Sequence, residues 1–120
     1  MKNKPMFRFA LRGQVFHIWL AQETYFHPRS LCVKAFTADN YPFATLTVNL
    51  VSPSQSFSRA YVDVNNCPWI EQFLVSNDIA VPVKNITAKS GYVIYPLYDF
   101  DLSKLVKISD TSVLATTERS

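Results

Sequence analysis

Residues 6–23 read MFRFALRGQVFHIWLAQE, and this stretch indicates the class of the structure. In its first part, every second residue is a large apolar one, and this alternation is typical of a strand with one buried face. The residues of that face are Phe7, Phe9 and Leu11. Gly13 can adopt the positive φ of a tight hairpin turn, so we expect the chain to reverse there. Residues 14–23 are apolar on both faces, which predicts a central strand that is covered on each side.

Three further strands are predicted on the C-terminal side of this hairpin. They occupy residues 31–37, 43–50 and 60–64, separated by a turn at 38–42 and a polar loop at 52–58. The strand over 43–50 has the clearest alternation. It predicts that Ala44, Leu46, Val48 and Leu50 point into the core while Thr45, Thr47 and Asn49 point out.

One main helix is predicted over Pro68–Ser76. Either Asn66 or Cys67 can cap it, and proline is tolerated in a first helical turn. Ile70, Phe73 and Leu74 then follow at helical spacing. Trp69 and Phe73 are four residues apart, so their side chains can contact each other on one face of the helix. Asn77 is typical of a helix end.

The last third of the chain carries weaker patterns. Residues 78–91 are expected to form a loop, and residues 92–100 an extended segment in which Pro96 indicates an edge strand or a bulge. Residues 102–108 predict a short helix. Residues 109–120 are rich in Ser and Thr without periodicity, which predicts a flexible tail.

These elements together predict an α+β fold. We expect a curled, mostly antiparallel sheet of about five to six strands, packed against one main helix. The chain has 120 residues, so residues 1–108 are expected to form one domain with its own core.

The charge is unevenly distributed along the chain. Residues 1–34 hold six basic and one acidic side chain, whereas residues 35–120 hold six basic and eight acidic side chains.

Two cysteines are too few for a disulfide framework and indicate a reducing compartment. Arginines interrupt the N-terminal region where a signal sequence would need an apolar core, and no apolar run reaches the roughly 20 residues of a membrane span. We therefore expect a cytoplasmic protein that does not contact a membrane.

Several blocks of the sequence resemble one known family. They are PFATLTVNL at 42–50, DVNNCPW at 63–69, SGY at 90–92 and YPLYDF at 95–100. The family consists of small bacterial proteins of unknown function, often carried on plasmids and integrative elements. The resemblance implies a mobile-element context and carries no catalytic assignment.

Two groups of residues are candidates for chemistry. Cys67 near a helix start can have a lowered thiol pKa and could act as a nucleophile with His17 or His27, but a structural junction is the simpler interpretation. The oxygen-rich group Asp63, Asn65, Asn66 and Glu71 lacks the spacing of a calcium loop, and turns with helix capping explain it more simply. We expect no catalytic site, cofactor or metal, and thus no enzyme.

Two binding hypotheses remain. The aromatic residues Tyr92, Tyr95 and Tyr98 can anchor an interface with an unidentified protein, and this non-enzymatic accessory role is the leading hypothesis. The alternative is a nucleic-acid-binding protein that uses the basic hairpin face with Arg8 and Arg12. The sequence does not decide the oligomeric state.

Overall fold

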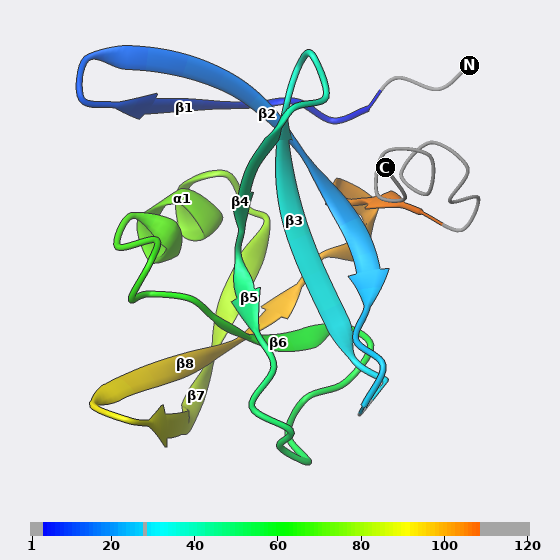
Figure 1. The fold of residues 1–120 in the computed structure, drawn as a ribbon, viewed down its shortest axis with the longest axis vertical. Coiled ribbons are helices and arrows are strands. Elements are labelled where there is room, and N and C mark those ends of the chain that lie inside the picture. Colours follow the sequence, from blue (N-terminus) through cyan, green and yellow to red (C-terminus); the bar gives the residue numbers. More distant parts are fainter. Residues whose placement is uncertain (1–3, 28, 109–120) are drawn as a thin grey trace.

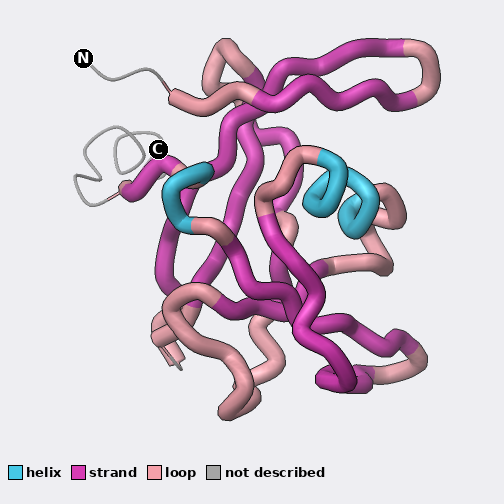
Figure 2. Tube along the Cα trace, turned by 180° about the vertical axis from the view of Figure 1, so that it is seen from behind, coloured by secondary structure: helices cyan, strands magenta, loops and turns pink. Residues whose placement is uncertain are grey.

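A computed structural model describes residues 4–27 and 29–108 of the chain. These residues form nine strands, one α-helix and one short 3₁₀ helix, and the strands belong to two sheets. Strands dominate the fold from either side (Figures 1 and 2). The predicted combination of mostly antiparallel sheet and one main helix is confirmed, but the strands are divided between two sheets. The predicted tail at 109–120 lies outside the described residues.

The first sheet is built around the predicted N-terminal hairpin. Its strands have the antiparallel order β1-β2-β3-β4 and comprise Phe7–Leu11, Gln14–Thr24, Leu31–Thr37 and Pro42–Thr45. A fifth strand, β9 (Val106–Lys107), pairs with β2 in parallel. β2 is central in its sheet, as predicted, but only residues 18–21 are buried on both faces, because Gln14, Val15 and His17 are exposed.

The second sheet has the order β5-β6-β8-β7 and is antiparallel throughout. Its strands comprise Thr47–Val48, Arg59–Val62, Val93–Phe100 and Ala80–Ser90. The long hairpin of β7 and β8 projects at the opposite end of the molecule from the hairpin of β1 and β2 (Figure 1).

The two sheets meet at Leu46, which separates β4 from β5. The amide of Leu46 donates to the Val33 carbonyl in the first sheet, and its own carbonyl accepts from the Asp63 amide beside the second sheet. The Leu46 side chain is fully buried. The single strand predicted for 43–50 is therefore wrong, because the chain leaves one sheet and enters the other at this residue.

Thr47 is also placed differently from the prediction that it points outward. It is buried, its hydroxyl oxygen accepts a hydrogen bond from the Val33 amide at 3.2 Å, and it lies 2.9 Å from the Tyr25 hydroxyl. The change of sheet at Leu46 ends the simple alternation, so the side chain after the corner turns inward.

The main helix, α1 (Ile70–Ser76), begins two residues later than predicted. Trp69 is its N-cap and makes no side-chain capping bond, so neither Asn66 nor Cys67 caps the helix. Ile70, Phe73 and Leu74 are buried, as their spacing predicted. The helix ends at Asn77, whose side-chain amide donates to the Phe73 carbonyl at 2.9 Å.

One apolar core joins both sheets and the helix. Its buried members come from β1, β2 and β3, from β6, β7 and β8, and from α1. A smaller cluster of Trp19, Ala21 and Phe36 lies on the other face of the first sheet, where Val106 and Ile108 pack against it. Lys4 lies over the Trp19 ring at 4.1 Å, and both side chains bond to Asn40.

Two predictions for the C-terminal third are wrong. Residues 80–90 form β7 instead of a loop, and the predicted 102–108 helix is reduced to the 3₁₀ turn η1 (Leu102–Lys104) followed by β9. β7 is an edge strand with mostly exposed residues, so it lacks apolar alternation. Pro82 and the positive φ of Asn85 accompany a shift in its pairing with β8 next to Pro96, which agrees with the predicted bulge. The alternative prediction of an edge strand at Pro96 is wrong, because β8 lies between β6 and β7.

Candidate functional site

The hairpin of β1 and β2 leaves one edge of β1 unpaired. A two-residue turn joins the strands, with Arg12 at φ 50° and Gly13 at φ 81°, and Leu11 opposes Gln14. Within the described part of the chain, β1 pairs with β2 alone. β1 lies between β2 and α1, so its free edge faces the helix (Figure 1).

The register shows which backbone groups point to this free edge. In a hairpin with a two-residue turn, the closing pair and every second pair beyond it exchange hydrogen bonds. These are the pairs of Leu11, Phe9 and Phe7 with β2. The N–H and C=O groups of Arg8 and Ala10 therefore point away from β2 and toward α1.

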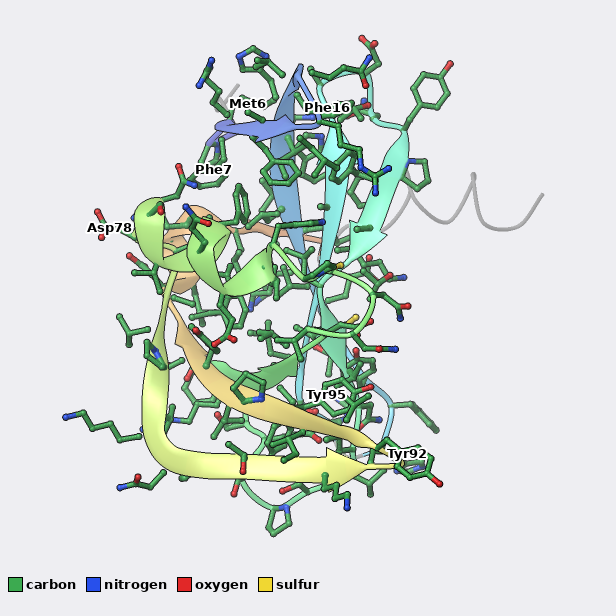
Figure 3. The ribbon with its side chains drawn as sticks, turned by 90° about the vertical axis from the view of Figure 1, so that its left-hand side faces the viewer. Met6, Phe7, Phe16, Asp78, Tyr92 and Tyr95 are labelled. Carbon is green, nitrogen blue, oxygen red and sulfur yellow. The ribbon has the colours of Figure 1, made fainter. Side chains whose placement is uncertain are left out.

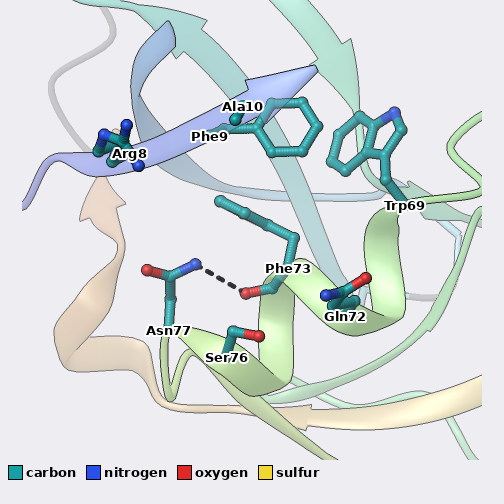
Figure 4. A pocket seen from close by; sticks show the side chains of 8 residues that line it. All are labelled: Arg8, Phe9, Ala10, Trp69, Gln72, Phe73, Ser76 and Asn77. Carbon is teal, nitrogen blue, oxygen red and sulfur yellow. Dashed lines mark hydrogen bonds between the residues drawn. The ribbon is translucent and has the colours of Figure 1, made fainter. Parts of the chain in front are cut away.

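A groove of about 230 Å³ separates this edge from the helix. β1 supplies residues 8–10, and the helix side supplies Trp69, Gln72, Phe73, Ser76 and Asn77. Figure 4 shows these two walls facing each other across the space.

The floor of the groove is aromatic and its rim is polar. The Phe9 ring lies 4.4 Å from Trp69 and 5.5 Å from Phe73, measured between centroids. Phe9 and Phe73 are buried, whereas Trp69 is half-buried and retains an accessible surface. Gln72 and Ser76 are exposed on the rim.

The charge of the groove is positive. Arg8 supplies the one charged side chain among the residues that line it, and it lies directly opposite His17 on the hairpin. Arg12 is exposed in the turn at the end of the same hairpin. The structure thus places one of the two predicted arginines in the groove wall and the other at the hairpin tip.

Two of the three candidate tyrosines, Tyr92 and Tyr95, lie at the other end of the molecule from the N-terminal hairpin. Tyr92 is fully exposed at the tip of the β7–β8 hairpin and Tyr95 is half-buried in β8. Figure 3 shows both at the opposite end of the molecule from Met6 and Phe16, which belong to the N-terminal hairpin region. The basic and aromatic candidates therefore do not form one surface.

Tyr98 is not available as an interface residue. It is 2 % exposed, and its hydroxyl donates a 2.6 Å hydrogen bond to the Glu71 carboxylate of α1. Burial and this carboxylate raise the pKa of the Tyr98 hydroxyl above its usual value. Tyr98 attaches the helix to the second sheet, which corrects the binding role predicted for it.

The environment of Cys67 opposes a nucleophilic role. Its side chain is buried, and burial together with the nearby Asp63 charge raises the thiol pKa to about 11. The helix begins only at Ile70, so the helix N-terminus that would stabilise a thiolate does not lie at this residue.

The oxygen-rich group around Asp63 forms a local turn. The Asp63 carboxylate accepts hydrogen bonds from the backbone amide and the side-chain amide of Asn66, at 3.1 and 2.8 Å, while Glu71 bonds to Tyr98. In residues 4–27 and 29–108, no group of three His, Cys, Asp or Glu side chains is arranged to hold a metal ion.

The sequence pattern did not identify the groove as a site. The Trp69–Phe73 spacing predicts packing between the two rings, and their centroids lie 5.9 Å apart. The opposite wall, however, is about 60 residues distant in sequence, so only the fold brings the two walls together.

The described residues form a small α+β domain with a groove between β1 and α1. The chain belongs to the family described as a domain of unknown function, DUF4313, whose model matches residues 20–118. The match includes the helix wall of the groove and begins after β1. Neither the curated proteins nor the solved structures contain a match to this chain.

Among the described residues, none of the helices is long and apolar enough to cross a bilayer.

Proposed function

We propose that this protein acts by binding another protein at the groove between β1 and α1, and that it is not an enzyme. The observation that carries this proposal is the accessible Trp69 ring on an aromatic floor with a polar rim. Binding energy at protein interfaces concentrates on such aromatic anchors, surrounded by polar residues that exclude water.

The biological setting of the proposal comes from the family resemblance. Proteins of that kind are often carried on plasmids and integrative elements, and we propose an accessory role for this chain in such an element. The accessory role rests on this resemblance, and the groove is the surface that we propose for its partner.

Site-specific photocrosslinking in the cells that naturally carry the gene tests the proposal. A benzophenone amino acid replaces Gln72 on the groove rim or, as a reference, Lys84 on β7. A groove partner forms a covalent product from position 72 and not from position 84. Equal products from both positions, or none from position 72, would contradict the proposal.

A blocking variant shows whether such a product depends on the groove. Ser76→Arg places a long side chain on the rim, whereas Val75→Arg adds the same charge on the neighbouring exposed residue, which does not line the groove. We expect Ser76→Arg to reduce the product at least about fivefold, as a loss of about 1 kcal/mol would, and Val75→Arg to leave it nearly unchanged.

Nucleic-acid binding is a second candidate because the hairpin carries exposed basic side chains. Arg8 and His17 are cross-strand neighbours and Arg12 follows in the turn. This candidate requires retardation of DNA or RNA that weakens steeply with salt and with Arg12→Ala. Arg12 lies outside the groove lining, so a protein partner is less sensitive to its loss. No retardation at low salt would eliminate this candidate.

A further inference from the structure

The free edge of β1 is more regular than the other long edges of the two sheets. Exposed edges usually carry prolines, bulges or charges that prevent pairing with another chain. β4 begins at Pro42 and its register with β3 shifts. β7 contains Pro82 and its register with β8 also shifts.

β1 lacks the proline and the register shift, and its one charged side chain is Arg8. Its five residues pair with β2 without a register shift, and its sequence, FRFAL, contains no proline. Arg8 and Ala10 are exposed, and their outward N–H and C=O groups face a space lined by Trp69 and Phe73. A row of alternating donors and acceptors is complementary to the backbone of another extended chain.

We propose that the groove binds an extended, acidic segment of a partner protein, which adds to the edge of β1 as a further strand. This inference rests on the proposed function and specifies how the partner is held. The partner's backbone bonds to Arg8 and Ala10, since the neighbouring strand in a sheet lies about 4.8 Å away.

The side chains of the added strand alternate between two environments. Those on the same face as Phe9 contact Trp69 and Phe73, so they are apolar. Those on the face of Arg8 and Ala10 lie in water beside the arginine, so acidic side chains are favoured there. The segment therefore alternates between apolar and acidic or polar residues.

A second copy of this chain fits the edge less well. Antiparallel pairing of two β1 strands would bring Arg8 and Arg12 of both copies to the same edge, and like charges on adjacent strands are destabilising. A nucleic acid fits less well because half of the edge groups are carbonyl oxygens, which repel phosphate.

The proposal can be tested with a proline substitution at the free edge. Ala10→Pro removes an outward N–H and leaves the bonds of Phe9 and Leu11 to β2 intact, because edge strands tolerate proline where the N–H faces solvent. Ala10→Thr is the matched control, since it changes the side chain and keeps the N–H. Urea denaturation of both variants checks that β1 remains folded.

The ligand is a peptide selected on the intact protein from a library of random linear peptides long enough to span β1. We expect peptides with alternating apolar and acidic residues. Fluorescence anisotropy should show a loss of affinity of at least about tenfold for Ala10→Pro, with Ala10→Thr within about twofold of the unmodified protein. Arg8→Gln should also weaken binding, and added salt should act in the same direction.

Several results would overturn strand addition. If Ala10→Pro binds as tightly as Ala10→Thr while Ser76→Arg still weakens binding, the groove binds its partner through side chains alone and the proposed function stands. If no selected peptide responds to Ser76→Arg, an extended segment is not the ligand. A dimer in sedimentation that Ala10→Pro dissociates would identify a second copy as the occupant.

Hydrogen exchange provides a measurement that needs no variant. The bound peptide should slow exchange of the outward amides of Arg8 and Ala10, which face solvent in the free protein. Unchanged exchange at both amides in a saturated complex would overturn the proposal even if Ala10→Pro fails to fold.

Discussion

At the residue scale, Thr47 shows how a polar side chain supports the junction between the two sheets. Its hydroxyl oxygen accepts from the Val33 amide of β3, and it is also bonded to the Tyr25 hydroxyl at the start of the β2–β3 connection. Because Thr47 is buried, water cannot replace these bonds when the hydroxyl is removed.

Thr47→Val should therefore lower the free energy of unfolding by about 2–3 kcal/mol, because it leaves buried polar groups without partners at nearly unchanged volume. Urea denaturation measures the loss. Thr47→Ser keeps the hydroxyl, so its free energy of unfolding should fall by less than that of Thr47→Val. Thr45→Val replaces an exposed residue and should change the free energy of unfolding by less than about 0.5 kcal/mol. Equal losses at positions 45 and 47 would show that the hydroxyl network contributes little.

The buried thiol of Cys67 makes stability depend on pH. Its pKa is raised from 9.0 to about 11, so the folded protein holds this proton more tightly than the unfolded chain. The resulting stability is complete below pH 9 and is lost as pH rises through about 11. When the pH is raised from 9 to about 11, the free energy of unfolding of Cys67→Ala should therefore fall by about 1–2 kcal/mol less than that of the unmodified protein. Urea denaturation at each pH measures this difference. Parallel pH profiles for the two proteins would contradict this expectation.

At the element scale, the turn of the first hairpin positions one wall of the groove. Gly13 has φ +81°, a conformation that L side chains rarely adopt, and a Cβ built there meets no atom within 4 Å. Gly13→Ala should thus cost about 1 kcal/mol from backbone strain alone. Gly13→Asn should cost less, because asparagine visits this region more readily. Thermal unfolding measures both, and a stabilising Gly13→Ala would contradict the role assigned to the turn.

Some elements could be predicted because their own residues specify them. β1, β2 and β3 alternate or are apolar on both faces, and Ile70, Phe73 and Leu74 define the helix. β7 could not, because an edge strand with exposed side chains needs no apolar alternation and its stability comes from pairing with β8. β9 has only two residues, and pairing with β2, far away in sequence, determines its conformation.

At the scale of the whole molecule, the candidate site depends on contacts that no local pattern encodes. Arg8 was recognised as a candidate from its own strand, but the groove exists because Phe9 packs on Trp69 and Phe73. Tyr98 was selected for its chemistry and is buried, since exposure is decided by the whole fold. Sequence patterns therefore suggest candidate side chains without showing which of them share a surface.

The same shared packing decides how the molecule unfolds. The main core takes buried side chains from both sheets and from α1, and Leu46 links the two sheets through the backbone. The smaller cluster around Trp19 has its own members on the outer face of the first sheet. Because β2 and β3 carry residues of both clusters, neither cluster can lose its packing without disturbing strands that the other requires.

We therefore expect one cooperative unfolding transition. Trp69→Phe leaves Trp19 as the fluorophore of the outer cluster, and Trp19→Phe leaves Trp69 as the fluorophore of the groove. In each variant the midpoint in urea should coincide with that of the far-ultraviolet circular dichroism, which reports the entire backbone. An earlier transition of Trp19 alone would show that β9 and the outer cluster detach first. In that case the core of the domain would end at Leu105, and the C-terminal strand would be an appendage that can open while the groove remains formed.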